Sequence, residues 1–556
     1  METHEEQKQK IKRLLIKEEE EVTQILAQKY GIPYINLINV TIELDYLKLI
    51  PEDKAREASI VVFSGTGKQI NVGLKKPNLQ LAQNLLKKLT EDGYKVQTYL
   101  ISSKSLEKAL SRYKEVPEFI QTTRGTVNIS TEAMEEFLSQ TNTLDRLKEL
   151  FDKRNESGET RKISQLLEIM ISGALKTDAS DIHIEPHEDK TKLRLRIDGV
   201  LHDILEFNSR SYQLIASRIK LISEMQLNIR EQAQDGRFTI NLKDTKIEVR
   251  SSTLPGPNGE SIVLRLLDPN TISISFEDLG LQPRLQEAIE KEIAKPNGMI
   301  LSTGPTGSGK TTTLYSFLKK ISSPSIKIIT IEDPIEYHLP NITQTQTNDK
   351  EGYTFSTGLR SILRQDPDVI LVGEIRDIEA ASIALNAALT GHLVLSTLHT
   401  NNAIGTIPRL IDLGANPSTI APSINVAIAQ RLVRKLCPFC KKRTEPKKEE
   451  REIIEKIVSS FPKENEKPSL KNLKIFTSSS CEKCNNIGYR GRMGIFEILL
   501  IDDKMETIIL KNPPETEIKQ AMDEQGFLNM KQDAISKIID GMTSFDEVKR
   551  IIDLNW

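Results

Sequence analysis

Residues 304 to 312 combine glycines with a lysine and two threonines at the spacing of a phosphate-binding loop. They are Gly304, Pro305, Thr306, Gly307, Ser308, Gly309, Lys310, Thr311 and Thr312. Glycines let such a loop turn its N–H groups inward, and a following helix N-terminus adds positive potential. Lys310 would reach the β- and γ-phosphates of ATP, and the Thr311 hydroxyl would ligate Mg²⁺. A glycine-rich turn without a ligand is the alternative. The apolar run 299–301 before the loop and the helical pattern 311–320 after it favour ATP binding.

Two apolar runs that read as buried strands end in carboxylates. Glu332 follows Ile-Ile-Thr-Ile, and Glu374 follows Val-Ile-Leu-Val-Gly. In a parallel sheet both strand ends open onto the edge that carries the phosphate loop. Single strand-end carboxylates often only make a loop polar, but two in one phosphate-binding domain suggest organisation of metal or water and general-base catalysis. His399 ends a fourth strand. A lone histidine there is more often structural, but from this edge it could contact the γ-phosphate.

All four cysteines of the chain form two Cys-x-x-Cys pairs. They are Cys437, Cys440, Cys481 and Cys484. This set suits tetrahedral binding of Zn²⁺ by four sulfurs, which leaves no ligand position for water and indicates a structural metal. A redox role for a single pair is the alternative, but paired motifs in a cytosolic chain favour zinc. The intervening residues 441–480 read as an inserted excursion rich in Lys and Glu.

The elements that must position these residues form an α/β pattern. Short apolar runs at 299–301, 326–331, 369–372 and 393–396, separated by helical patterns, predict a mostly parallel sheet with crossovers. The tail from about 500 reads as helical. We therefore expect an ATPase domain over residues 276–500, with the zinc insertion at 437–484, and a C-terminal helical region over 501–556.

The residues before this domain divide into two smaller modules. Residues 1–151 hold an amphipathic helix over 1–30, then strands at 60–63 and 69–74 and a helix at 79–89. The polar run 152–162 predicts a linker. A second domain over 163–275 combines helices at 164–176 and 212–224 with strands, which are predicted at 192–197, 237–242, 246–251 and 261–267.

Composition restricts the class of partner. The 556 residues carry a net charge of −2, so no global field attracts nucleic acid or an anionic membrane. The acidic start Met-Glu-Thr-His-Glu-Glu has no apolar core, and no apolar run approaches the roughly 18 residues of a membrane-spanning helix. These features predict a cytoplasmic protein that inserts into no lipid and binds no nucleic acid.

Five motifs in order resemble the secretion-superfamily ATPases, and within them the ATPases of type IV pilus assembly and type II secretion. The resemblance covers about residues 160–556 and rests on the segments 304–313, 331–337, 363–368, 372–377 and 390–400. It implies a RecA-like P-loop core, preceded by a smaller PAS-like α/β domain and an N-terminal α/β module. It also implies a homohexameric ring with nucleotide between subunits, docked at the inner face of the cytoplasmic membrane on an inner-membrane platform protein.

The resemblance also gives the second domain a role. The segments 178–185, 193–199 and 234–237 are similar to the family's domain before the motor core, in which arginines approach the nucleotide phosphates. Arg194, Arg196 and Arg210 are the candidates here, because a guanidinium stabilises charge on the γ-phosphoryl group. Without the resemblance, outward-facing arginines on an alternating strand would be the plainer interpretation of the first two. Relatives often carry a tetracysteine at the same place, and residues 30–115 resemble their N-terminal domain.

The favoured function is a motor for assembling type IV pili. Type II secretion is the nearest alternative. A pilus-retraction motor is less favoured, since those relatives usually lack the N-terminal module and the tetracysteine. A nucleic-acid motor and a nucleotide switch without turnover are further alternatives; the near-zero charge opposes the first of these.

Overall fold

The computed structural model describes residues 18–91, 93–115, 126–127, 149, 161–241, 246–268, 274–463 and 467–554. The chain divides into two compact units, Met1–Ile197 with Leu201–Leu266, and Asp198–Val200 with Leu267–Trp556. Residues 1–17 of the predicted first helix lie outside the described residues. So does the predicted linker 152–162, apart from its last two residues, where helix α8 begins.

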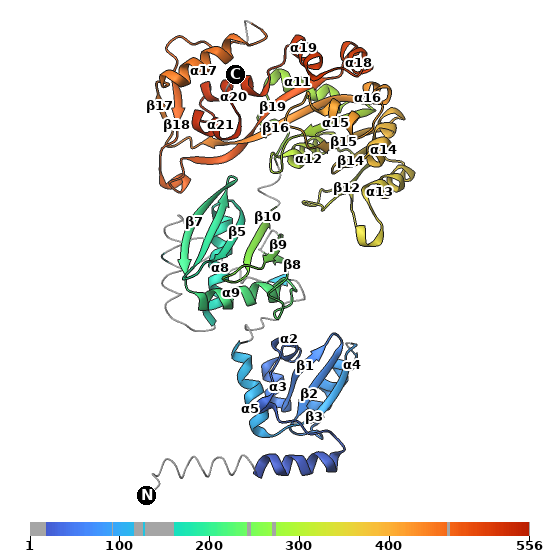
Figure 1. Ribbon diagram of the computed structural model, residues 1–556, viewed down its shortest axis with the longest axis vertical. Helices are drawn as coiled ribbons and strands as arrows, with labels where there is room; N and C mark the ends of the chain where they lie inside the picture. Colours follow the sequence, from blue (N-terminus) through green and yellow to red (C-terminus); the bar gives the residue numbers. More distant parts are fainter. Residues whose placement is uncertain are drawn as a thin grey trace. The chain divides into compact units, whose positions relative to one another are not determined.

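The N-terminal part is a small α/β fold, as the sequence predicts (Figure 1). Residues 18–30 are helical, and the helix ends at Gly31 with a φ of 64°. The sheet has the order β1-β2-β3, with β1 antiparallel and β3 parallel to β2. Its elements are η1 (Leu37–Asn39), α2 (Leu44–Leu47), α3 (Glu52–Ala58), β1 (Ile60–Thr66), β2 (Gln69–Leu74), α4 (Gln80–Glu91), β3 (Lys95–Leu100), α5 (Ser103–Ser111) and η2 (Arg112–Glu115).

The middle part is a seven-stranded sheet with the order β4-β8-β9-β10-β5-β6-β7. Strand β6 buries alternate residues, so its leucines face the interior and its arginines lie on the other face. Helices α8 and α9 pack against each other, and α8 packs on β5. The elements are β4 (Thr126–Val127), α8 (Arg161–Lys176), β5 (Ala179–Pro186), β6 (Thr191–Ile197), β7 (Val200–Phe207), α9 (Ser209–Ile222), β8 (Gln234–Asn241), β9 (Lys246–Leu254) and β10 (Ser261–Leu267).

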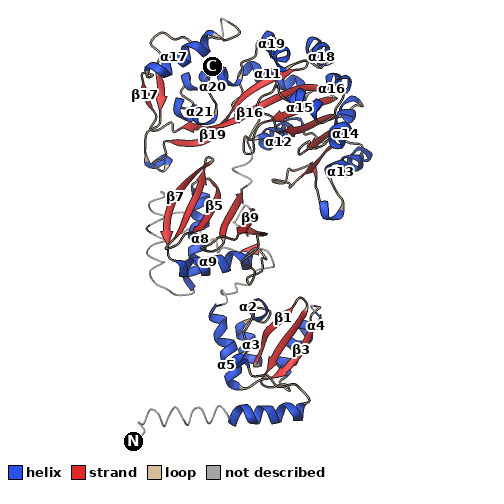
Figure 2. Ribbon diagram, in the orientation of Figure 1, coloured by secondary structure: helices blue, strands red, loops and turns tan. Residues whose placement is uncertain are grey.

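The C-terminal part is built on a second seven-stranded sheet, with the order β13-β12-β14-β15-β11-β16-β19 (Figure 2). Every neighbouring pair is parallel except β16 and β19. The predicted mostly parallel sheet is confirmed. Its strands are β11 (Gly298–Thr303), β12 (Ile328–Glu332), β13 (Thr343–Gln346), β14 (Val369–Val372), β15 (Leu393–Leu398), β16 (Ile424–Leu436) and β19 (Tyr489–Leu500).

Helices cover both faces of this sheet, because its strands bury residues on both sides. Met299 and Leu301 of β11 join one core with α13 to α16, and Ile300 joins the other with α11 and α12. The helices are η3 (Glu277–Leu279), α11 (Pro283–Ile293), α12 (Lys310–Ile321), η4 (Asp349–Glu351), α13 (Phe355–Ile362), η5 (Leu363–Gln365), α14 (Ile378–Leu389), α15 (Thr406–Asp412) and α16 (Pro417–Ser423).

The last part of the chain forms the excursion between β16 and β19, followed by helices. The excursion holds β17 (Lys442–Thr444), α17 (Lys448–Ser459), β18 (Ile475–Thr477) and η7 (Glu482–Cys484). The helical tail consists of α18 (Asp503–Ile509), α19 (Glu515–Gln525), α20 (Met530–Ile539) and α21 (Phe545–Ile551), as its sequence predicts.

Among the described residues, no helix has both the length and the apolar character needed to cross a bilayer.

Candidate functional site

The phosphate loop joins the end of β11 to the start of α12, in the strand–loop–helix arrangement that the sequence predicts. Gly304, Gly307 and Gly309 have φ angles of 148°, 79° and 89°, which side chains disfavour. A Cβ atom at Gly304 would lie 2.6 Å from both the Gln430 carbonyl oxygen and Ser308 Oγ. The backbone of the loop therefore requires glycine on conformational grounds, and at Gly304 also on steric grounds.

Lys310, the first residue of α12, is 9% exposed. Its ammonium group donates to the carbonyl oxygens of Gly304 at 2.8 Å and Pro305 at 3.3 Å. Burial lowers the pKa of Lys310, and Arg431 lowers it further, whereas Glu374 raises it. The buried Ser308 hydroxyl has no hydrogen-bond partner among the described residues. A buried cation and an unpaired hydroxyl in one glycine-rich loop fit a bound phosphate group.

Glu374 lies just after β14 and faces two basic side chains. His399 Nε2 is 3.2 Å from Glu374 Oε2, and the Arg376 guanidinium forms an ion pair with the same carboxylate. The hydrogen bond to Glu374 raises the pKa of Arg376. Asp333 Oδ2 lies 3.6 Å from Arg376 Nη2, so a second carboxylate joins this group. The structure thus brings the predicted residues Glu374 and His399 together.

Glu332 lies in different surroundings. Its carboxylate is buried, with 3% of the residue exposed, and accepts hydrogen bonds from Tyr315, Thr330 and Gln344. Burial raises the pKa of the Tyr315 hydroxyl, and the charge of Glu332 raises it further. Tyr315 lies on α12. Glu332, the last residue of β12, therefore connects this strand to the helix that follows the phosphate loop.

Sequence reasoning did not select Asp333 or Arg376. The signal for Asp333 was its position directly after the strand residue Glu332, because the first residue beyond a fully buried strand is free to face the sheet edge. Arg376 lies in the motif segment 372–377, which could have drawn attention to it, and the ion pair with Glu374 distinguishes it from other loop arginines.

A threonine pair fixes the segment after His399 beside the phosphate loop. Thr303, the last residue of β11, accepts a hydrogen bond from the Thr400 backbone N–H at 2.9 Å. The two hydroxyl groups are 2.6 Å apart. The ends of β11 and β15 are therefore held in fixed relation where the loop begins.

Thr311 and Thr312 are partly buried in the first turn of α12.

The predicted arginines lie in the middle part of the chain. Arg194 on β6 forms ion pairs with Glu185 at 3.4 Å and Asp203 at 2.8 Å. Arg196 lies 3.4 Å from the carboxylate of Asp181, which is 4% exposed. Arg210 is exposed in the first turn of α9. Two of the three guanidinium groups are thus engaged by carboxylates of their own domain.

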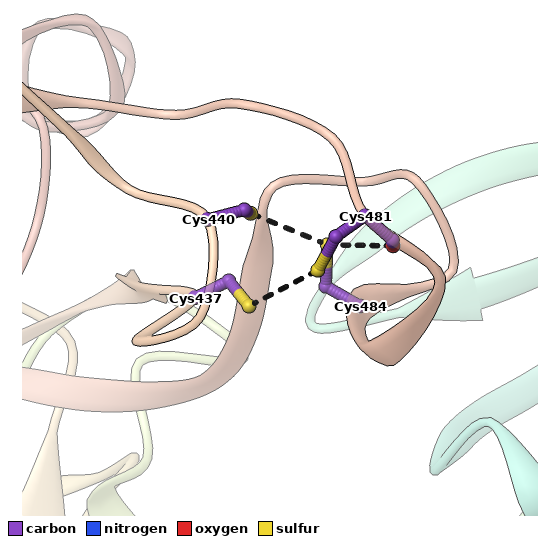
Figure 3. Close-up of side chains that lie close together, drawn as sticks. All are labelled: Cys437, Cys440, Cys481 and Cys484. Carbon is purple, nitrogen blue, oxygen red and sulfur yellow. Dashed lines mark hydrogen bonds between the residues drawn. The ribbon is translucent and has the colours of Figure 1, made fainter.

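The four cysteines converge beside the end of β16 and the start of β19, in the segments that follow β16 and precede β19 (Figure 3). Sulfur–sulfur distances are 3.8 Å for Cys437 with Cys481, 3.8 Å for Cys440 with Cys484, and 3.6 Å for Cys481 with Cys484. Four sulfurs at about 2.3 Å around a tetrahedral zinc ion lie about 3.8 Å apart. The Gly488 N–H also donates to Cys484 Sγ at 3.2 Å. The donor set therefore fits zinc.

Similarity to known proteins identifies the family of this chain. The sequence profile of the family described as "Type II/IV secretion system protein" matches residues 156–550. The type IV pilus assembly ATPase PilB of Myxococcus xanthus is 36% identical over 96% of this chain and 91% of its own length. The type II secretion system ATPase E of Vibrio cholerae is 42% identical over 71% of this chain and 76% of its own.

A solved structure supports the fold. The ATPase DotB of Legionella pneumophila superposes with a TM-score of 0.51 at 23% identity, over 69% of this chain and 95% of that one. The profile match and the relatives confirm the resemblance that the sequence motifs suggest. The chain belongs to the type II/IV secretion system protein family, and it is an ATPase of that family.

Proposed function

We propose that the chain is a hexameric motor that hydrolyses ATP to assemble type IV pili through an inner-membrane platform protein. The observation that carries this proposal is the similarity to the pilus assembly ATPase of Myxococcus xanthus, which extends over 96% of the chain and so includes its N-terminal part. The type II secretion relative matches only 71% of the chain, although at the higher identity of 42%. Type II secretion therefore remains the second candidate.

In this proposal the phosphate loop binds ATP with residues 304–312. Lys310 exchanges the loop carbonyls that it now contacts for the β- and γ-phosphates, and Ser308 gains a partner. Thr311 would ligate Mg²⁺, which would neutralise part of the phosphate charge when bound. The hydroxyl of Thr311 is an oxygen donor, the ligand type that Mg²⁺ prefers.

Glu374 is the proposed general base for the attacking water. Arg376 and His399 hold its carboxylate from two sides, so its orientation is set before the nucleotide arrives. Asp333 joins the site through Arg376. Glu332 contributes from the interior by fixing Tyr315 and thereby the helix that carries Lys310.

The remaining parts have supporting roles. We assign residues 276–500 to a RecA-like core and 163–275 to a PAS-like domain whose Arg194, Arg196 or Arg210 approaches the nucleotide of a neighbouring subunit. Residues 1–151 dock on the membrane partner, and residues 152–162 link this N-terminal module to the PAS-like domain. Residues 501–556 support the core. The four cysteines hold a structural zinc ion. The motor acts in the cytoplasm, at the inner face of the membrane, without inserting into lipid or binding nucleic acid.

Gene deletion in the source organism tests the assembly role. Loss of surface pili with normal protein secretion supports the proposal, provided that the wild-type gene restores the pili and the Glu374→Gln gene does not. Loss of secretion with normal pili would favour the type II secretion role. An ATPase rate strongly stimulated by DNA would contradict both.

A further inference from the structure

Strand β16 borders the phosphate loop on the side opposite β15. Strand β11, which leads into the loop, pairs with β15 on one edge and with β16 on the other. The β15 side is fixed by Thr303 and Thr400. On the β16 side, Gln430 and Arg431 lie next to the loop, and neither has a role in the site described above.

Gln430 contacts both ends of the loop. It is 2% exposed, and its Oε1 accepts a 2.7 Å hydrogen bond from Thr313 Oγ1 in the first turn of α12. A Cβ atom at Gly309 would lie 2.8 Å from its Nε2, and one at Gly304 would lie 2.6 Å from its carbonyl oxygen. Gln430 therefore restricts the backbone at both ends of the phosphate loop: at Gly304, where the loop begins, and at Gly309, where α12 starts.

Arg431 connects the loop to the segment after His399. Its Nη1 donates to the Gln430 carbonyl at 3.1 Å, and its Nη2 donates to the Asn401 carbonyl at 2.8 Å. A Cβ atom at Gly304 would lie 3.2 Å from Nη1. Among the described residues, no carboxylate lies within ion-pair distance of this guanidinium. The nearest acidic influence is Glu497, whose carboxylate accepts backbone N–H groups of Ala403 and Met530.

The two cations at the loop disfavour each other. Burial lowers the pKa of Arg431, against an opposing effect of Glu497. Burial and the charge of Arg431 lower the pKa of Lys310, against an opposing effect of Glu374. Both groups regain stability when an anion comes close, and a nucleoside triphosphate carries the highest charge of the common nucleotides. The electrostatic cost of holding these two cations close together therefore favours a polyphosphate ligand at the loop.

We propose that Gln430 and Arg431 are positioning residues for ATP. Gln430 fixes the curvature of the phosphate loop through Gly304, Gly309 and Thr313. Arg431 keeps the loop and the segment after His399 in one geometry, and its charge adds to that of Lys310 at the phosphates. This proposal rests on the assignment of ATP to the phosphate loop and extends the site to a strand that carries no recognised nucleotide-binding motif.

Steady-state ATPase kinetics and thermal unfolding of the full-length protein test this role. We expect Arg431→Gln to raise KM for ATP roughly 10- to 100-fold, the range for loss of charged hydrogen bonds, with a smaller change in kcat. The rise in Tm on adding an ATP analogue shrinks, while Tm without nucleotide changes little. Arg431→Lys keeps the charge but cannot reach both carbonyls at once, so its KM falls between those of the wild type and Arg431→Gln. Gln430→Met raises KM because Thr313 loses its acceptor.

Two controls separate the outcomes. Lys435→Gln changes an exposed residue on the same strand and should leave KM and both Tm values unchanged. Lys310→Ala should abolish binding of a fluorescent ATP analogue; if it does not, the nucleotide lies elsewhere and this proposal falls with that assignment. If Lys310→Ala abolishes binding but the Arg431 and Gln430 variants only lower Tm without nucleotide, at unchanged KM, the positioning role alone is wrong.

Discussion

Adjacent carboxylates at the end of β12 differ in what surrounds them. Glu332 is inside the protein with three hydrogen-bond donors, and Asp333 contacts Arg376 at the site. When a buried carboxylate loses its charge, every hydrogen bond that it accepts becomes weaker. When a partly exposed carboxylate loses its charge, mainly the local electrostatic field changes. Substitution at the two positions therefore has separable effects.

We expect Glu332→Gln to lower the free energy of unfolding by about 1.5 to 3 kcal/mol, since hydrogen bonds to a charged group are lost. Asp333→Asn should change it by less than about 0.5 kcal/mol but lower kcat. Urea unfolding and steady-state ATPase assays distinguish these results. Equal losses of stability in the two variants would contradict the different surroundings described for them.

Glu374→Gln tests the general base. We expect kcat to fall by roughly 10²- to 10⁴-fold, the typical contribution of a positioned base, with the affinity for ATP nearly unchanged. Glu379→Gln is a matched control, because Glu379 forms only an exposed ion pair with Arg360. Single-turnover hydrolysis and equilibrium binding measure the two effects. An unchanged rate in Glu374→Gln would remove Glu374 from the mechanism.

At the scale of elements, β16 is anchored at Arg434, three residues beyond Arg431 on the same strand. Arg434 donates from Nε and Nη2 to Glu547 of α21, which also pairs with Arg550. The Glu547 side chain is 0% exposed. Burial alone would raise the pKa of Glu547, but hydrogen bonds from Arg550 and Arg434 outweigh burial and hold it below its usual value. The C-terminal helix thereby fixes the strand.

This anchor predicts a pH dependence of stability. Because the pKa of Glu547 is lower in the folded chain than the value of about 4.3 in the unfolded chain, its stabilisation is complete above that pH. The stabilisation is lost as pH falls through the folded-state pKa. Glu547→Gln should therefore cost about 3 to 5 kcal/mol at neutral pH, as for a broken buried ion pair, and progressively less in acid.

Denaturant unfolding between pH 3 and pH 7 measures this difference. Asp546→Asn, at the exposed neighbouring position, serves as the control and should show no such convergence. A gap between Glu547→Gln and the wild type that stays constant over the whole range would show that the charge of Glu547 does not stabilise the fold.

The strands that the sequence predicted are those with short apolar runs, such as β12 and β14, or with clear alternation, such as β6. Strands β16 and β19 were not predicted. β16 contains Ala429, Gln430, Arg431 and Lys435, which fit a helix as well as a strand. Pairing with β11 on one side and β19 on the other determines its conformation, and both partners are distant in sequence. The intrinsic helix or strand propensity of these residues does not indicate such long-range pairing.

The candidate site shows the same limit. The contact between Glu374 and His399 followed from the rule that parallel strands end at one edge. The interior position of Glu332 did not follow from this rule, because the burial of the last residue of a strand depends on which face of the sheet its side chain lies on. The ion pairs of Arg194 and Arg196 also depend on strand register, which the sequence alone leaves open.

At the scale of the whole molecule, the four cysteines close a long excursion, and the proposed zinc ion would hold them together. We expect one zinc ion per chain by inductively coupled plasma mass spectrometry, and its loss in Cys481→Ser. Because four thiolates would otherwise be held close together without a ligand, removal should lower stability by several kcal/mol. Glu482→Ser, at an exposed position between the ligands, should retain the metal. Full zinc content in Cys481→Ser would contradict the four-sulfur site.

The proposed ring predicts complementation between defective subunits. If an arginine of one subunit serves the Glu374 of its neighbour, Arg194→Gln and Glu374→Gln are each inactive alone. Mixed rings should recover about a quarter of the wild-type sites at equal ratio, where each intact residue meets the other by chance. ATPase assays after subunit exchange measure this. Absence of recovery for Arg194, Arg196 and Arg210 variants alike would contradict an arginine supplied between subunits.

The position of β16 between β11 and β19 has a consequence for biosynthesis. Gln430 leaves the ribosome 126 residues after Gly304. At 5 to 20 residues per second this interval is about 6 to 25 s. A nascent chain that ends at Ser423 already contains the loop, Glu374 and His399, but lacks the strand beside the loop. Such a chain leaves one edge of β11 without its partner strand, and an unpaired edge is a site where another chain can associate until β16 is made.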